Sequence, residues 1–402
     1  MSWLDTFLKE TSFVETPKQW LYWSGIATIS AIVSPAVTVN KGAYKLKPNL
    51  FVLLVGRSGL GKGFGPSLAK DLVKMVNNTR VISGRGTIEA IVKDLSIIKA
   101  RENGSIPFKD ARGFLCSGEF ASSLYEAPHA LTVLTDLYDG HYNPTWDNNL
   151  KNSPVENLKD VCLTLLSGAN QDMFDLSVGK SHRSGGFVGR TLLISCEKRY
   201  QSNSMIYTAD EEIPTVNREK LAAYLFKLSK LSGSMIWSVG AKKKYDEWFY
   251  PYRDAEVDDK TGTYDRMNDH VIKVATCISL ARAETMILEA EDVEEAIEMC
   301  SPLSTTARKV AGLQGNSVTS GAAKAFLLMM LKAPENALTR KQVLQRGFGD
   351  FDASELDRII ETLTQANYVA QVQGGKDIKY KLTAHCLNWW QQRQKQKDSS
   401  IN

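Results

Sequence analysis

The stretch from Asn49 to Ser67, NLFVLLVGRSGLGKGFGPS, joins an apolar run to a glycine-rich turn. Its first part, Leu50 to Val55, contains only apolar residues, as expected of a buried parallel strand. A helix is predicted from near Pro66 to about Val76, because proline is tolerated in the first turn of a helix. A strand, a glycine loop and a helix in succession indicate the beginning of an α/β fold.

The loop in this stretch fits the pattern G-x-x-x-x-G-K at Gly56, Gly61 and Lys62. In such a loop the glycines turn main-chain N–H groups toward phosphate oxygens. The helix that follows adds the positive end of its dipole, and the lysine reaches the terminal phosphates. An ordinary strand-to-helix turn is the alternative. The residues expected to contact a nucleotide are Gly56, Ser58, Gly59, Gly61, Lys62 and Gly63.

Two glycines depart from the usual pattern of magnesium ligands. Gly63 stands where a Ser or Thr normally holds the metal. In GFLCSGEFASSL, Glu119 follows an apolar run, but Gly118 replaces the Asp that usually helps to hold magnesium. Glu119 is a candidate for polarising the attacking water, and a surface glutamate that caps the next helix is the alternative. The expected cofactors are ATP and Mg²⁺, with the ion held through waters and the nucleotide phosphates.

Two other strand candidates carry polar residues at their ends. Asn170 follows the candidate from Val161 to Ser167, where it could orient water against the terminal phosphate, although amides after strands are often turn residues. Arg190 begins the candidate from Arg190 to Cys196, where it could reach the phosphates of a neighbouring subunit. A surface arginine is the alternative there. Glu119, Asn170 and Arg190 are the predicted catalytic residues.

Further strands are expected at Arg80 to Ser83 and Gly113 to Ser117, with a helix from Thr87 to about Ala100. Strands that alternate with helices imply a largely parallel α/β sheet, with the ligand at the carboxyl ends of its strands.

The order of these signals resembles the AAA+ class of P-loop ATPases: a phosphate loop, a short strand, an acidic strand, a polar-ended strand, and an arginine beside a strand. The segment from Tyr264 to about Lys309 is expected to form an amphipathic helix, a turn, and a second helix that begins at Ala290. It is similar to the helical lid of AAA+ replicative helicases. An arginine early in the first lid helix senses the nucleotide in that group, and the resemblance gives this role to Arg266.

A narrower resemblance rests on TPKQWLYWSGIATISAIV, KPNLFVLLVGRSGLGKG, GTIEAIVKDL, LTDLYDGHYN and SGGFVGRTLLI read together. These stretches resemble a family of helicase-like P-loop proteins of phages and mobile elements, some of which are fused behind primase domains. The resemblance spans roughly residues 10 to 310. It implies a homo-oligomer, such as a hexameric ring, that takes part in DNA replication or mobilisation beside other replication proteins.

The pattern changes at LQGNSVTSGA, residues 313 to 322, which is typical of a linker. Helices are then expected at Ala323 to Leu331, Thr339 to Gln345 and Ala353 to Asn367, followed by a hairpin around Gly374 and Gly375. This order resembles a winged-helix domain.

The third of these helices is too acidic to read a major groove well. The hairpin offers DNA phosphates Lys376, Lys379 and Lys381, which predict salt-dependent binding with little sequence selectivity. A role in protein contact alone is the alternative.

The predicted fold is therefore α/β: an AAA+-like P-loop core with a parallel sheet, a helical lid and a C-terminal winged helix. The expected boundaries are an N-terminal helical segment at 1–45, the core at 46–205, the lid at 206–312, the linker at 313–322, the winged helix at 323–388 and a polar tail at 389–402.

Composition adds little to this prediction. The net charge is +4, and residues 320 to 402 hold 12 Lys and Arg against 8 Asp and Glu, so the excess lies in the C-terminal module. A modest basic excess suits a nucleic-acid partner or a solvated face. The six cysteines and five histidines show no metal-ligand spacing, so no transition-metal site is expected. With no signal peptide and no long apolar run, a cytoplasmic protein without a membrane partner is expected.

Two functions from different classes fit these observations. The first is an oligomeric ATPase acting on single-stranded or non-specific duplex DNA. The second is a nucleotide-binding scaffold or DNA-bound adaptor that does not hydrolyse ATP, in which the missing magnesium ligands record lost catalysis. A simple winged-helix regulator would leave the first 310 residues without a role.

Overall fold

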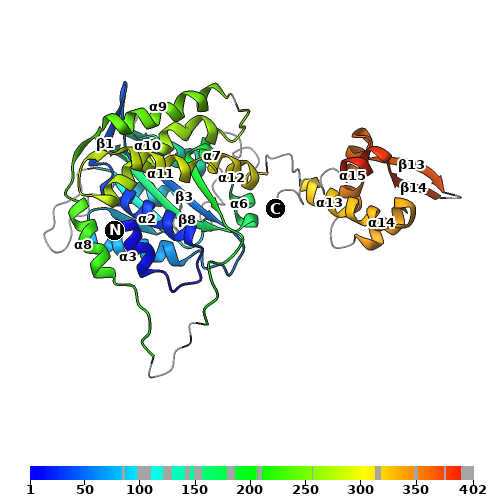
Figure 1. The fold of residues 1–402 in the computed structure, drawn as a ribbon, viewed down its shortest axis with the longest axis horizontal. Coiled ribbons are helices and arrows are strands. Elements are labelled where there is room, and N and C mark those ends of the chain that lie inside the picture. The colour runs from blue at the N-terminus through cyan, green and yellow to red at the C-terminus, as the bar shows by residue number, and fades with distance from the viewer. Residues whose placement is uncertain are drawn as a thin grey trace. The chain divides into compact units, whose positions relative to one another are not determined.

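The computed structural model (Figure 1) describes residues 1–83, 87–96, 110–120, 129–140, 145–148, 156–178, 186–204, 206, 211–255, 257–312, 318–347, 352–374 and 377–390. The chain divides into two compact units, Met1–Ala311 and Gly312–Asn402. The predicted N-terminal segment, core and lid thus all lie in the first unit.

A five-stranded parallel sheet forms the centre of the first unit. Its strands run in the order β4-β5-β8-β3-β9, so the first of them in the chain, β3, lies between two later ones. Every residue of β3 and β8 is buried, which explains why both read as continuous apolar runs. The parallel sheet and the α/β class are as predicted. The strands are β3 (Phe51–Val55), β4 (Arg80–Ser83), β5 (Arg112–Ser117), β8 (Cys162–Ala169) and β9 (Thr191–Ser195).

Helices cover both faces of this sheet. Alternate residues of β3 point to opposite faces: Val52 and Leu54 belong to one hydrophobic cluster, Phe51 and Leu53 to the other. The first cluster includes α2 (Lys18–Val33), α3 (Phe64–Val76), α8 (Arg218–Leu228) and α10 (Thr263–Arg282). The second includes α4 (Ile88–Ser96), α5 (Ala130–Tyr138), α6 (Gln171–Ser177) and α7 (Gly186–Arg190).

A second sheet accompanies the first, in the order β11-β10-β1-β2. Its residues had been predicted to belong to the N-terminal helical segment or to the lid. Val37 and Val39 instead alternate with more exposed residues and pack into the core, as the residues of a strand do. Its strands are β1 (Val37–Lys41), β2 (Tyr44–Leu46), β10 (Gly233–Trp237) and β11 (Ile287–Leu288), and a separate hairpin joins β6 (Thr145–Asn148) to β7 (Glu156–Lys159).

The predicted second lid helix is interrupted. Instead of one helix from Ala290 to Lys309, the chain forms α11 (Ala290–Cys300) and α12 (Leu303–Val310). Pro302 lies at the break, where its missing N–H and its ring prevent the first helix from continuing. The unit also contains α1 (Trp3–Glu10) and α9 (Val239–Asp254).

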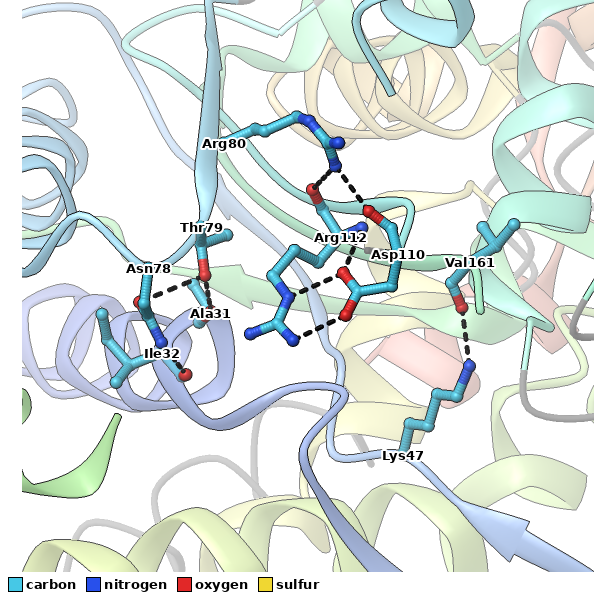
Figure 2. Close-up of polar contacts among 9 residues, drawn as sticks. All are labelled: Ala31, Ile32, Lys47, Asn78, Thr79, Arg80, Asp110, Arg112 and Val161. Carbon is cyan, nitrogen blue, oxygen red and sulfur yellow. Dashed lines mark hydrogen bonds and ion pairs between the residues drawn. The ribbon is translucent and has the colours of Figure 1, made fainter. Parts of the chain in front are cut away.

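Helix α2 is buried from Trp20 to Val33, and its carboxyl end is held by the residues before β4 (Figure 2). The Ala31 carbonyl would normally accept from residue 35, which is a proline without an N–H. Thr79 Oγ1 donates to this carbonyl at 2.8 Å instead, and Asn78 Nδ2 donates to the Ile32 carbonyl at 2.7 Å. Side chains thus satisfy carbonyls that a helix end leaves open.

The amino edge of the central sheet is held in a similar way (Figure 2). Arg112 forms a two-pronged ion pair with Asp110, with nitrogen–oxygen distances of 2.7 and 2.6 Å. Arg80 donates to the main-chain carbonyls of both residues, so β4 and β5 begin side by side. Lys47, which is buried before β3, donates to the Val161 carbonyl at 3.0 Å next to the start of β8.

In its described residues, the second unit combines helices with a three-stranded antiparallel sheet in the order β12-β14-β13. Its first helix begins at Val318, inside the stretch predicted to be a linker, and apolar residues of this helix from Ala323 onward pack into the core of the unit. The elements are α13 (Val318–Leu331), η2 (Pro334–Asn336), β12 (Ala337–Thr339), α14 (Arg340–Arg346), α15 (Ala353–Gln365), β13 (Val369–Gly374) and β14 (Asp377–Leu382).

Among the helices of the described residues, none has the length and apolar character that crossing a bilayer requires.

We predict that Thr79→Val lowers the free energy of unfolding by about 1–3 kcal/mol, because it keeps the shape of the side chain but leaves the Ala31 carbonyl buried without its donor. Urea unfolding followed by circular dichroism measures the change. Thr79→Ser retains the hydroxyl and serves as the control. Equal stability of the valine variant and the native chain would contradict this role.

Candidate functional site

The carboxyl ends of β3 and β8 lie beside each other, and the chain leaves them toward opposite faces of the sheet. Helix α3 follows β3 on one face, and α6 follows β8 on the other. Such a switch point opens a crevice at the sheet edge, the usual ligand position in open α/β sheets. A cavity of about 270 Å³ lies there. It is lined by Ser58, Gly59, Lys62, Gly63, Gly118, Glu119, Phe120, Gly168, Ala169, Asn170 and Met173.

The loop between β3 and α3 exposes main-chain donors to this cavity. Gly59 and Gly61 have φ angles of +84° and +80°, a backbone region that glycine adopts without strain. Within the described part of the chain, hydrogen bonds engage the N–H groups of Gly56 and Phe64 but none of those of residues 57 to 63. A run of unengaged N–H groups at a helix start is suited to an anion.

Lys62 is the cation of the cavity. Its Nζ donates to the Gly56 carbonyl at 2.6 Å and to the Arg57 carbonyl at 3.0 Å. Burial lowers the pKa of Lys62, and the nearby charge of Glu119 opposes this shift. Because its partners are neutral carbonyls of the loop, the ammonium group can exchange them for an anion that enters the cavity.

Glu119 and Asn170 line the same cavity as Lys62, as expected from their positions after adjacent strands. The Phe120 N–H donates to the Gly168 carbonyl at 2.6 Å, which fixes the chain that carries Glu119 against β8. Asn170 caps α6, because its Oδ1 accepts from the Met173 N–H at 2.7 Å. This bond leaves the side-chain NH₂ group of Asn170 as the donor available to a ligand.

Side chains of the N-terminal segment contact the loop and the start of α3, although no sequence motif marks them as part of the site. Thr16 Oγ1 donates to the Gly61 carbonyl at 3.2 Å. A Cβ at Gly56 would lie 2.8 Å from the ring of Trp20, and one at Gly65 would collide with the hydroxyl of Ser24. These three side chains therefore restrict the position that the loop can take relative to the sheet.

Gly168 is a further residue of the site that was not predicted from the sequence. A Cβ at this position would lie 2.7 Å from the Gly118 carbonyl oxygen and 3.0 Å from Lys62 Cβ. A lone glycine inside a buried strand often marks such a close approach, so LSGANQD carried a usable signal.

The cavity does not fit a magnesium ion held by protein ligands. At the two positions where this loop pattern places metal-binding side chains, Gly63 and Gly118 face each other, and a Cβ at Gly118 would lie 3.8 Å from Gly63 Cα. No group of three or more His, Cys, Asp or Glu side chains suited to a metal occurs among the described residues. At these two positions of the described chain, glycine offers neither the hydroxyl nor the carboxylate that this loop pattern uses for magnesium.

Arg190 and Arg266 lie outside the residues that line this cavity. Arg190 precedes β9, at the amino edge of the sheet, where its Nε donates to Asp139 Oδ1 at 2.9 Å. A Cβ at Gly189 would lie 2.9 Å from a guanidinium nitrogen of Arg266. Burial lowers the pKa of Arg266, and the Arg190 charge lowers it further. The two arginines are thus neighbours, and contact of either with a nucleotide stays a prediction.

The predicted DNA contacts belong to the second unit. Lys379 and Lys381 lie on β14 on the face opposite the buried Tyr380 and Leu382, because alternate residues of a strand point to opposite sides. Lys376 falls outside the described residues.

A scan against protein-family models and a search of the curated proteins gave no match for this chain.

His270, beside the two arginines, provides a test of the packing at this edge. Its Nε2 lies 3.0 Å from the Gly189 carbonyl oxygen, so this nitrogen carries the hydrogen, and Nδ1 has no partner among the described residues. Burial lowers the pKa of His270 from 6.5 to about 4. The folded state therefore favours the neutral ring.

We predict that the chain loses stability as the pH falls from 6.5 to about 4, because the unfolded state binds a proton that folded His270 does not. The free energy of unfolding should fall by at most about 1.4 kcal/mol per pH unit. Urea unfolding of the native chain and of His270→Gln, compared at several pH values, isolates this contribution. His385→Gln, at an exposed histidine, is the control. Parallel pH profiles for all three proteins would refute the prediction.

Proposed function

We propose that this protein is an ATP-binding, AAA+-like P-loop protein that acts in DNA replication or mobilisation. One observation carries the proposal: the glycine loop with Lys62, Glu119 after β5 and Asn170 after β8 all line one cavity at a switch point of a parallel sheet. A phosphate group there would meet loop N–H groups and an ammonium group on one side and a carboxylate on the other. This arrangement suits binding of a polyphosphate and positioning of water against its last phosphorus.

The strand order supports the AAA+-like assignment. Strand β8, which ends in Asn170, lies between the loop strand β3 and the acidic strand β5. The loop, Asn170 and Glu119 therefore follow three adjacent strands of one parallel sheet, in keeping with the proposed assignment.

Hydrolysis would have to proceed without the magnesium-binding side chains that Gly63 and Gly118 replace. In the hydrolysing form, Glu119 would accept a proton from water while Lys62 and the loop N–H groups stabilise charge on the phosphate oxygens. The second candidate function, a nucleotide-binding scaffold, is favoured by the same two glycines.

The proposal includes an oligomer, since Arg190 lies away from the cavity of its own chain. A neighbouring subunit would have to bring its cavity to the amino edge of the sheet, where Arg190 would exchange Asp139 for phosphate oxygens. Arg266, beside Arg190, would add a second positive charge to this contact.

The second unit is proposed to bind DNA as a winged helix. Its helices α13, α14 and α15 precede the hairpin of β13 and β14, and the resemblance to a winged helix rests on this order. Arg340 pairs with Asp357 of α15, so the acidic character of this helix is partly neutralised within the unit. The outward lysines of β14 remain the preferred phosphate contacts.

We predict that the protein hydrolyses ATP with magnesium, faster with single-stranded DNA, and that Lys62→Ala lowers the rate by about 100-fold because the terminal phosphates lose their cation. Phosphate release measures the rate. Lys74→Ala, an exposed lysine on α3, is the control. Turnover that persists in the Lys62 variant would exclude this cavity as the active site. No turnover, together with nucleotide binding that needs Lys62, would select the scaffold.

We predict that Lys379→Ala/Lys381→Ala weakens DNA binding and flattens the slope of log K against log salt by about 2, since each lost phosphate contact removes about 1. Fluorescence anisotropy of labelled DNA at several salt concentrations measures both quantities. Lys332→Ala, an exposed lysine of the same unit, is the control. An unchanged slope would indicate that this strand serves protein contact.

A further inference from the structure

Gly63 and Gly118 differ from Gly56, Gly61 and Gly168 in what a side chain would meet. A Cβ at Gly63 would find no atom within 4 Å, and one at Gly118 would meet only Gly63 Cα at an ordinary 3.8 Å. At Gly56, Gly61 and Gly168 it would approach a neighbouring atom within 2.6 to 2.7 Å. Packing therefore demands glycine at the latter three positions but not at Gly63 or Gly118.

Backbone conformation does not demand glycine at Gly63 either. It caps α3 with φ −78° and ψ −18°, angles that any L residue adopts. The cavity thus has room for the serine and aspartate that a metal-binding version of this loop would carry. What it lacks at these positions is oxygen, not space.

Among the described residues around the crevice, few other side-chain oxygens could replace them. The hydroxyl of Ser58 also lines the cavity, on an exposed part of the loop. The hydroxyls of Ser117 and Ser167 lie 2.8 Å apart. The Ser117 hydroxyl is also within hydrogen-bond distance of the Glu119 carbonyl, and the Ser167 hydroxyl of the Ser117 carbonyl. Asn170 Oδ1 is used in capping α6. Glu119 remains as the carboxylate of the cavity, and its charge acts on Lys62.

We propose that the cavity binds a nucleotide di- or triphosphate without needing magnesium, because Lys62 and loop N–H groups neutralise the phosphates in place of a divalent ion held by the protein. This inference rests on the proposed nucleotide binding and specifies that this binding is indifferent to magnesium. A metal changes an affinity only when it interacts more strongly, or less strongly, with the complex than with the free nucleotide and protein. Magnesium that contacts only nucleotide and water has little to add here, and it cancels phosphate charge that Lys62 would otherwise meet.

The test measures the affinity of the full chain for ATP and ADP by calorimetry, with excess EDTA and with MgCl₂. For the native chain we expect dissociation constants within about threefold of each other, a difference well below one tenfold step in affinity. Lys62→Ala should abolish binding in both buffers. A native chain that loses affinity about tenfold or more in EDTA would overturn the inference while leaving nucleotide binding intact.

Gly63→Ser/Gly118→Asp tests whether the two glycines cause this behaviour. The new hydroxyl and carboxylate should make binding at least about tenfold weaker in EDTA than with magnesium, since the added negative charge repels unmetallated phosphates. Gly63→Ala/Gly118→Ala adds the Cβ atoms without metal ligands and should behave like the native chain. Circular dichroism checks folding, and Gly63→Ser alone replaces the double variant if it unfolds.

The outcomes separate the two proposals. Nucleotide binding that is absent in both buffers, or that ignores Lys62, would overturn the proposed function and the inference together. Lys62-dependent binding that requires magnesium would overturn the inference alone. A double variant that stays indifferent to magnesium would refute the role given to Gly63 and Gly118.

Discussion

The contact between the buried helix α2 and the turn after β3 is the constraint on which the site depends. Trp20 donates from its indole Nε1 to the Ile194 carbonyl of β9 at 2.9 Å, and its ring lies directly below Gly56. Ser24, one turn later, fits against Gly65 at the start of α3. Because any larger residue at either glycine would push the loop away from the sheet, α2 fixes where Lys62 can lie. The N-terminal segment is therefore part of the site's foundation and not an appendage.

The electrostatics of the cavity follow from this rigid support. Lys62 is drawn into partly buried surroundings, where its charge is poorly solvated and is met by two carbonyl groups and, at longer range, by Glu119. Loop N–H groups held in place by the Thr16 hydroxyl add partial positive charge on the same side. Among the described residues that line the cavity, positive charge thus gathers beside one carboxylate, that of Glu119. Such a field gains most from a ligand that keeps its negative charge.

Much of this fold could be predicted from the sequence, since buried parallel strands such as Phe51–Val55 and Cys162–Ala169 read as apolar runs and lie close to their expected bounds. Glu119 and Asn170 were assigned to the site because carboxyl ends of parallel strands share one edge. Thr16 and Trp20 could not be found this way, because they contact residues that lie 45 and 174 positions away in the sequence, and such contacts leave no local pattern. The strands at Val37 and Gly233 were missed for the same reason: they pair with each other across the chain.

The surroundings of Gly63 and Gly118 show what the loss of the usual magnesium ligands has done to the cavity, which the motif alone could not tell. A substitution that merely lost a ligand could have left a crowded or distorted site, in which restoring the ligand would be impossible. Here Gly63 has helical angles and open space, and Gly118 has only an ordinary contact, so the surrounding structure has not closed over the position. The neighbouring glycines at 56, 61 and 168, by contrast, are held by packing. If the cavity binds phosphate as proposed, it differs from a metal-dependent site in the chemistry at these two positions and not in the space that they leave.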